Sequence, residues 1–104
     1  VTLDGMRFLN FSAISSGVAA YSLEIRRSAA RELEGIEPRD RRLKIIERIR
    51  ALAGEPHPPG ALKLAGSKNA YRIRHGDYRV LYEVVEAERR IVVVKLGHRR
   101  EVYR

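Results

Sequence analysis

The sequence predicts an α+β fold, in which a small, twisted and mainly antiparallel sheet of four strands carries an N-terminal pair of helices on one face. Three observations predict it. A short alternating segment is followed by two segments with helical signals, and then by three strand-like runs separated by turns. The order is therefore strand, helix, helix and three strands. We expect the second face of this sheet to remain uncovered and available to a ligand.

Composition narrows the class of protein. With 104 residues there is room for one domain with a modest core. A formal net charge of +8 and a pI near 10.4 favour polyanionic partners, with nucleic acid first, an acidic protein second and an anionic membrane third. The absence of cysteine excludes a disulfide framework and the usual zinc motifs, and the three histidines form no helical pair. No apolar run approaches the roughly 18 residues of a membrane span. We expect a soluble, cytoplasmic protein without a metal or other cofactor.

The chain divides into an extension and a domain. Residues 1–20 are predicted to be an N-terminal extension, partly disordered or laid on the surface, because polar residues interrupt their weak apolar stretch. Residues 21–104 are predicted to form the single domain. Its first strand is residues 21–26, where Tyr21, Leu23 and Ile25 share one face.

Two helices follow this strand. Ser28 is the expected N-cap of the first, which should stop near Gly35. Pro38 is expected to begin the second, and Gly54 to end it. Apolar side chains recur at three- and four-residue spacing along the second helix and predict one buried stripe, made of Leu43, Ile45, Ile46, Ile49 and Leu52.

A hairpin is the clearest local signal. Residues 71–75 and 78–85 alternate on either side of Gly76 and Asp77, and glycine can take the positive φ that a tight hairpin turn needs. That turn would place His75 opposite Tyr78, Arg74 opposite Arg79, and Arg72 opposite Leu81. Opposed residues project from the same face, so Arg72, Arg74 and Arg79 would share a face away from the apolar one. Because like charges that oppose each other are destabilising, this arrangement indicates an anion-binding surface.

The last strand closes the fold. Residues 91–96 are strand-like and apolar on both faces, which predicts a central or covered strand that Gly97 ends. The short linker 86–90 predicts a second antiparallel connection.

Beyond the last strand, we expect His98, Arg99 and Tyr103 to join the three hairpin arginines on the uncovered face. Arginine stays charged and binds phosphate bidentately, whereas histidine and tyrosine can transfer protons. RNA carries its own nucleophile, the 2′-hydroxyl, so such a site suffices for metal-free RNA cleavage.

Four segments together resemble the RelE family of toxin endoribonucleases within the wider RelE/ParE superfamily: LKLAG at 62–66, YRIR at 71–74, DYRVLYEV at 77–84 and GHRREVY at 97–103. The resemblance covers residues 21–104 and implies a strand, two helices and three strands. It also implies a toxin that enters the ribosomal A site, cuts mRNA there, and is neutralised by a RelB-like antitoxin that wraps around it.

The resemblance also implies roles for single residues. Arg72 and Arg74 occupy positions that are lysines in the best-known member and would bind substrate, together with Lys63. Arg79 matches a phosphate-binding arginine, Arg99 an arginine near the leaving group, and Tyr103 the proposed general base. Arginine preserves the charge of lysine but not its acid–base capacity, which gives Tyr103 and His98 more weight.

Two other functions fit the same fold. A ParE-like toxin would poison DNA gyrase through protein contacts without catalysis, although a phosphate-holding arginine cluster is not needed for that purpose. A catalytically inactive relative would persist as an antitoxin-binding or RNA-binding module.

Overall fold

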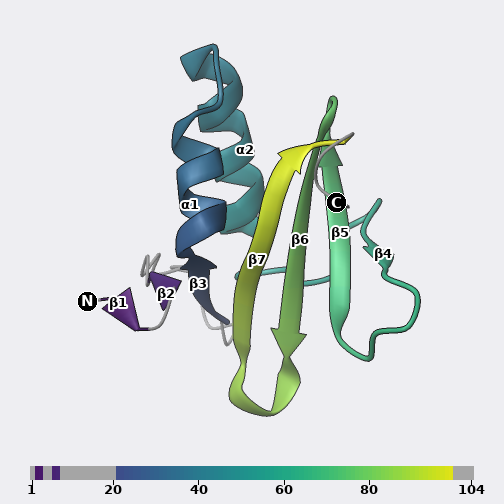
Figure 1. Ribbon diagram of the computed structural model, residues 1–104. Coiled ribbons are helices and arrows are strands. Elements are labelled where there is room, and N and C mark those ends of the chain that lie inside the picture. Colours follow the sequence, from purple (N-terminus) through teal and green to yellow (C-terminus); the bar gives the residue numbers. More distant parts are fainter. Residues whose placement is uncertain (1, 4–5, 8–20, 100–104) are drawn as a thin grey trace.

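The computed structural model of the protein describes residues 2–3, 6–7 and 21–99. Two helices pack against a sheet whose long strands run the height of the molecule (Figure 1). The helices are α1 (Arg27–Glu34) and α2 (Arg39–Ala51), and a 3₁₀ turn, η1 (Glu86–Glu88), joins the last two strands. The strands are β1 (Thr2–Leu3), β2 (Met6–Arg7), β3 (Ser22–Arg26), β4 (Leu62–Lys63), β5 (Ala70–His75), β6 (Tyr78–Val85) and β7 (Arg90–His98). The predicted α+β fold and its element order are confirmed.

The sheet has the order β1-β2-β3-β7-β6-β5-β4. The four predicted strands form its centre, and three two-residue strands, β1, β2 and β4, lengthen it beyond the prediction. All neighbours pair antiparallel except β3 and β7, which are parallel. Within the predicted extension, only β1 and β2 belong to the described residues, and they continue the sheet beyond β3. Residues 8–20 lie outside the described part, so their state stays a prediction.

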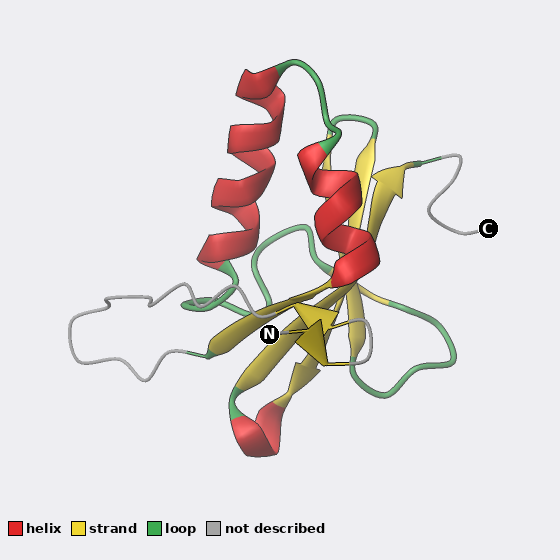
Figure 2. Ribbon diagram, turned by 60° about the vertical axis from the view of Figure 1, so that its left-hand side comes forward, coloured by secondary structure: helices red, strands yellow, loops and turns green. Residues whose placement is uncertain are grey.

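The hydrophobic core lies between the helices and one face of the sheet, on the side where both helices appear in Figure 2. Each long strand contributes alternate residues to it, as a half-buried strand does. Tyr82 is the largest fully buried side chain, and its hydroxyl donates a hydrogen bond to the carbonyl oxygen of Pro56 at 2.7 Å. Burial raises the pKa of Tyr82 to about 12, because the phenolate is poorly solvated there. Tyr82 is therefore a core residue.

The helices depart from prediction at two places. Helix α1 begins at Arg27 with Arg26 at the cap and without a side-chain capping bond, so the prediction of Ser28 as the N-cap is wrong. In α2, Ile45 and Ile49 are completely buried, but Leu43 is 44% exposed. Ile46 is only partly buried against the core, so the buried stripe is narrower than the spacing predicted. Helix α2 begins at Arg39 with Pro38 as its N-cap, one residue later than predicted, and it ends at Ala51 rather than at Gly54.

Strand β7 also differs from prediction. It runs through Gly97 to His98 rather than stopping before the glycine. Its pairing with β6 is irregular, because Tyr82 lies opposite Val93 whereas Leu81 lies opposite Lys95. Val94 is the extra residue of this β-bulge, which shifts every later residue of β7 to the opposite face. The bulge turns Leu96 into the core and Lys95 out of it.

In the part of the chain that the structure describes, neither α1 nor α2 has the length and the apolar composition of a membrane-spanning helix.

Candidate functional site

The β5–β6 hairpin has the predicted geometry. His75 lies opposite Tyr78, Arg74 opposite Arg79, and Arg72 opposite Leu81. Gly76 has a φ of +59°, the conformation expected of a glycine in a tight hairpin turn. Since Ile73, Val80 and Tyr82 fill the core, the three arginines project from the face that the helices leave uncovered.

Two rows of residues cross this uncovered face from β5 to β7. The first consists of Arg72, Leu81 and Lys95, and the second of Arg74, Arg79 and Gly97. Leu81 is only 8% exposed although it is outside the hydrophobic core, because it lies between two long cationic side chains. In the first row, the cationic side chains of Arg72 and Lys95 therefore flank the apolar side chain of Leu81. Gly97 has no side chain, which leaves the sheet beside Arg79 open.

The cations of the second row differ in their contacts. Arg79 donates hydrogen bonds from Nη1 to the carbonyl oxygens of Gly76 and Tyr78, each at 3.3 Å. Arg74 is exposed, and its carbonyl oxygen accepts a bond from Arg48 of α2 at 3.0 Å. Within residues 21–99, no carboxylate lies within ion-pair distance of the Arg74 or Arg79 guanidinium. The two opposed arginines therefore form a like-charge pair that an anion would stabilise.

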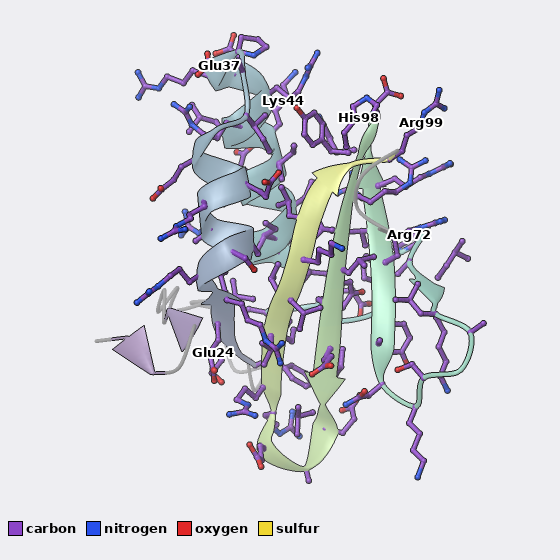
Figure 3. The ribbon with its side chains drawn as sticks, in the orientation of Figure 1. Glu24, Glu37, Lys44, Arg72, His98 and Arg99 are labelled. Atoms are coloured by element: carbon purple, nitrogen blue, oxygen red, sulfur yellow. The ribbon has the colours of Figure 1, made fainter. Side chains whose placement is uncertain are left out.

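Arg99 extends the basic surface beyond the end of β7. Its amide donates to the carbonyl oxygen of Asp77 at 2.7 Å, which ties the chain after β7 to the hairpin turn. Its Nε lies 4.0 Å from Oδ1 of Asp77, and its side chain is about half exposed. Figure 3 shows Arg99 at the upper end of the sheet, with Arg72 lower on the β5 side. The hairpin and the end of β7 thus bring the predicted arginines to one region.

Two predicted site residues lie elsewhere. His98 pairs with Tyr78 and so projects toward the helix-covered side, and its placement on the uncovered face was wrong. The bulge in β7 is the reason, because in a regular strand the His98 side chain would project from the uncovered face. Lys63 pairs with Tyr71, and its neighbour Leu62 faces Arg72, so Lys63 also projects from the face opposite the arginines. Tyr103 lies outside the described residues.

Lys95 is the functional candidate that the sequence analysis missed. It lies in a run that is apolar on both sides, and a regular strand would have placed it against the core. A charged residue at a nominal core position in a strand is a signal for a bulge, and this was the one clue available.

The far end of the sheet has a different character. Glu86 accepts a hydrogen bond from the Tyr21 hydroxyl at 2.6 Å and lies 3.3 Å from Nε2 of His57. The hydrogen bond from Tyr21, followed by that from His57, lowers the pKa of Glu86. The Tyr21–Glu86 hydrogen bond also raises the pKa of Tyr21.

Glu24 is buried on the uncovered side of β3, 3.5 Å from Nε of Arg90. Figure 3 shows Glu24 at the end opposite His98 and Arg99. Glu24 and Glu86 thus lie away from the basic region.

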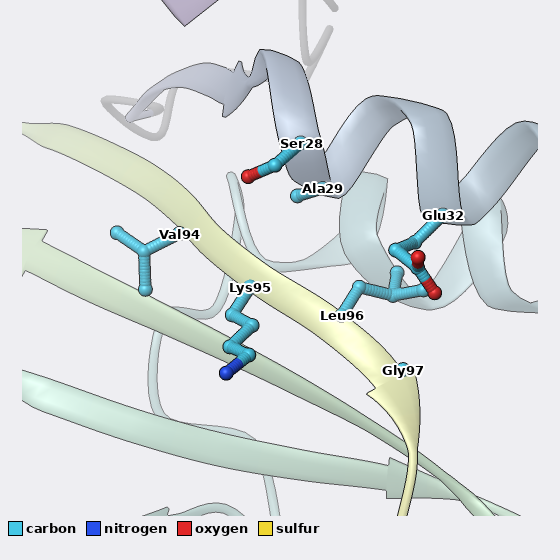
Figure 4. A pocket seen from close by; sticks show the side chains of 7 residues that line it. All are labelled: Ser28, Ala29, Glu32, Val94, Lys95, Leu96 and Gly97. Carbon is cyan, nitrogen blue, oxygen red and sulfur yellow. The ribbon is translucent and has the colours of Figure 1, made fainter. Parts of the chain in front are cut away.

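A groove separates α1 from the exposed edge of β7 (Figure 4). Its volume is about 240 Å³, and its lining residues are Ser28, Ala29, Glu32, Val94, Lys95, Leu96 and Gly97. Strand β3 pairs with β7 only as far as Val93. In the described part of the chain, the edge of β7 beyond Val93 has no strand partner on the β3 side, which makes it a surface for another chain.

Comparison with known proteins places this arrangement in a family. The sequence model of the ParE toxin of the type II toxin–antitoxin system parDE matches residues 23–103. The chain belongs to the ParE toxin family. A candidate toxin, RelE1 of Methanocaldococcus jannaschii, is 30% identical over 87 residues, which cover 81% of this chain and 96% of that relative. This ParE-family toxin is therefore also a member of the wider RelE/ParE superfamily.

Solved structures share the fold. The RelE–RelB complex of Pyrococcus horikoshii contains a chain that is 29% identical, with a TM-score of 0.66 over 79% of this chain and 98% of that one. The isolated RelE toxin of E. coli is 22% identical, with a TM-score of 0.66 over 76% of this chain and 84% of that one. The similarity to the E. coli toxin supports only the fold of this ParE-family chain.

Proposed function

We propose that this toxin is an endoribonuclease that cuts mRNA, in the ribosomal A site, through attack of the 2′-hydroxyl on the adjacent phosphate. One observation carries the proposal: Arg74 and Arg79 oppose each other on an uncovered sheet face, without a carboxylate in ion-pair range among residues 21–99. A fold that keeps two like charges opposed is stabilised when a phosphate lies between them. The adjoining Arg72, Leu81 and Lys95 add charge over an apolar floor, where electrostatic interactions are stronger than in water.

The chemistry needs a phosphate holder, a proton acceptor and stabilisation of the leaving oxygen. Arg72, Arg74 and Arg79 hold the phosphates that flank the cut. The 2′-oxygen bonds to phosphorus, its proton passes to the phenolate oxygen of Tyr103, and the bond to the 5′-oxygen breaks. Arg99 stabilises the charge that develops on the phosphorane and on the leaving oxygen, which then takes a proton from solvent. Tyr103 is assigned by the family resemblance.

His98 and Lys63 have weaker support. Both project from the helix-covered side, so neither shares a face with Arg79. Lys95 is a better candidate for contact with substrate, because it lies in the same row as Arg72.

We propose a RelB-like antitoxin as the protein partner. The relative from P. horikoshii was solved as a complex of RelE with RelB. The groove between α1 and the unpaired edge of β7 is the surface on which we expect part of such an antitoxin to bind, since an extended segment can pair there with the strand edge (Figure 4).

A second function is favoured by the matching family description, which names ParE toxin. In that alternative the toxin poisons DNA gyrase through protein contacts, and the arginines serve an acidic protein surface.

The two functions are separated by inducing the toxin in cells and mapping a translated mRNA by primer extension. The variants are Arg79→Ala and Arg99→Ala, with Arg39→Ala as a control that loses the same charge at an exposed position of α2. We expect codon-phased cuts in the wild type and the control. Loss of one preorganised charge should reduce cleavage by roughly a hundred-fold or more.

Two outcomes contradict the proposal. Intact mRNA together with gyrase-dependent DNA breaks in the wild type would establish the alternative. Full cleavage by both variants, after a thermal melt has shown that they are folded, would show that Arg79 and Arg99 are not part of the catalytic site.

A further inference from the structure

A cavity of about 390 Å³ lies at the tip of the β5–β6 hairpin, on the side opposite the arginine rows. Its lining residues are Arg41, His75, Gly76, Asp77, Tyr78 and His98. The volume is within the range of sites that bind small molecules. Four elements contribute to it, namely α2, β5 with its turn, β6 and the end of β7, so its shape depends on the tertiary fold.

The cavity and the proposed phosphate surface share the hairpin turn. Gly76 and Tyr78 line the cavity, and their carbonyl oxygens accept the two 3.3 Å bonds from Arg79. Asp77 also lines it, and its carbonyl oxygen accepts the 2.7 Å bond from the Arg99 amide. A strand of RNA with a phosphate at Arg79 therefore has a neighbouring nucleotide within reach of the cavity, around the tip of the hairpin.

The lining offers an aromatic surface. The rings of Tyr78 and His98 meet edge to face, with centroids 6.0 Å apart and an interplanar angle of 76°. The Arg41 guanidinium lies over the Tyr78 ring at 6.0 Å from its centroid. Aromatic rings and guanidinium planes are the groups on which unpaired RNA bases stack.

The lining also offers a donor and an acceptor. Arg41 is an exposed guanidinium, and Asp77 is an exposed carboxylate whose Oδ2 is 4.0 Å from Nε2 of His98. Guanine presents the acceptors O6 and N7 to an arginine, and the donors N1–H and N2–H₂ to a carboxylate. Adenine and the pyrimidines each lack at least one of these two complementary edges.

From this combination we infer that the cavity binds a guanine base of the RNA strand held at Arg79. The inference rests on the proposed ribonuclease function for the identity of the strand. Arg41 donates to the O6 and N7 edge, Asp77 accepts from the N1 and N2 edge, and Tyr78 supports the ring.

The direct test measures the binding of 5′-GMP, 5′-AMP, 5′-CMP and 5′-UMP to the full chain by NMR titration. We expect GMP to bind at least about ten-fold more tightly than the other three, since one good bidentate contact gives about that discrimination. Arg41→Gln and Asp77→Asn should each remove the preference. Arg39→Gln and Asp40→Asn are the matched controls, because these exposed neighbours on α2 do not line the cavity and should retain the preference.

Several results would overturn the inference. They are equal binding or no binding of the four nucleotides, an unchanged preference in both cavity variants, or displacement of GMP by equimolar inorganic phosphate. The last result would show that the cavity recognises the phosphate rather than the base.

The experiments distinguish failure of the guanine-binding inference from failure of the proposed ribonuclease function. Arg74→Ala lies on the other face, and we expect it to lose cleavage while it keeps the GMP preference. A wild type that selects GMP but cuts no RNA would refute the nuclease alone. A wild type that cuts RNA but binds all four nucleotides equally would refute the cavity alone.

Discussion

The opposed pair of Arg74 and Arg79 should reduce the stability of the fold, and a double-mutant cycle can measure by how much. The perturbations are Arg74→Gln, Arg79→Gln and the double variant. Directly opposed Cβ atoms are roughly 5 Å apart, which gives about 0.8 kcal/mol of repulsion between unit charges at the dielectric constant of water. Measured cross-strand pairs contribute about 0.2–1 kcal/mol, so we expect a repulsive coupling energy in this range at low salt.

The single variants should differ. Arg74→Gln relieves the repulsion, and within residues 21–99 the Arg74 guanidinium makes no hydrogen bond or ion pair that would be lost. The free energy of unfolding should therefore rise by about 0.5 kcal/mol. Arg79→Gln relieves the same repulsion but loses the bonds to the carbonyl oxygens of Gly76 and Tyr78, each of which contributes about 0.5–1.5 kcal/mol. Arg79→Gln should therefore be neutral or destabilising.

Urea unfolding of the four proteins, at about 10 mM and again at about 150 mM ionic strength, gives the coupling energy and its screening. Sulfate should stabilise the wild type more than it stabilises Arg74→Gln, since the anion binds between the two guanidiniums. A coupling energy that is zero or attractive at low salt would refute the reasoning, and so would an equal response of both proteins to sulfate.

Three other predictions concern the fold that supports the site. The wild type should lose stability at high pH, and Tyr82→Phe should not show this loss. Urea unfolding of both proteins over a range of pH measures the difference in their free energies of unfolding. The folded pKa of Tyr82 is raised to about 12, so its contribution is complete below its ordinary pKa of 10 and is lost between these values by up to about 1.4 kcal/mol per pH unit. Ile49→Ala should cost about 2–5 kcal/mol because Ile49 is fully buried, whereas Leu43→Ala, at 44% exposure, should change the free energy of unfolding by less than about 0.5 kcal/mol. Gly76→Ala should lower it by about 1–2 kcal/mol, because alanine is strained at a φ of +59° although the space for a Cβ is open.

Local patterns in the sequence predicted most of the fold. The alternation on both sides of Gly76 and Asp77 was sufficient to predict each pair of the hairpin, including Arg74 with Arg79, because a two-residue turn leaves a single register. Helix boundaries were less accurate. Ser28 matches the preferences of an N-cap, but the extended chain enters α1 directly from β3, so the helix begins before it.

The errors along β7 have one origin. A bulge adds a residue to one strand, and every assignment of faces beyond it is reversed; the charge of Lys95 within an apolar run was its one signal in the sequence. His98 was therefore expected on the uncovered face, and Lys95 was not considered. The alternation rule is reliable only while the two strands stay in register.

The parallel pairing of β3 with β7 has a consequence for synthesis. The first long strand hydrogen-bonds to the last one, so Leu23 and Ile25 acquire their neighbours Ile91 and Val93 only after almost the whole chain has been made. Contacts between such distant segments form late in folding. A nascent chain that stops before residue 90 should be fully sensitive to protease, and protection of that fragment would contradict this expectation. A product that ends before residue 90 lacks β7 and Arg99, so we expect it to form neither the complete sheet nor the complete basic surface of the toxin.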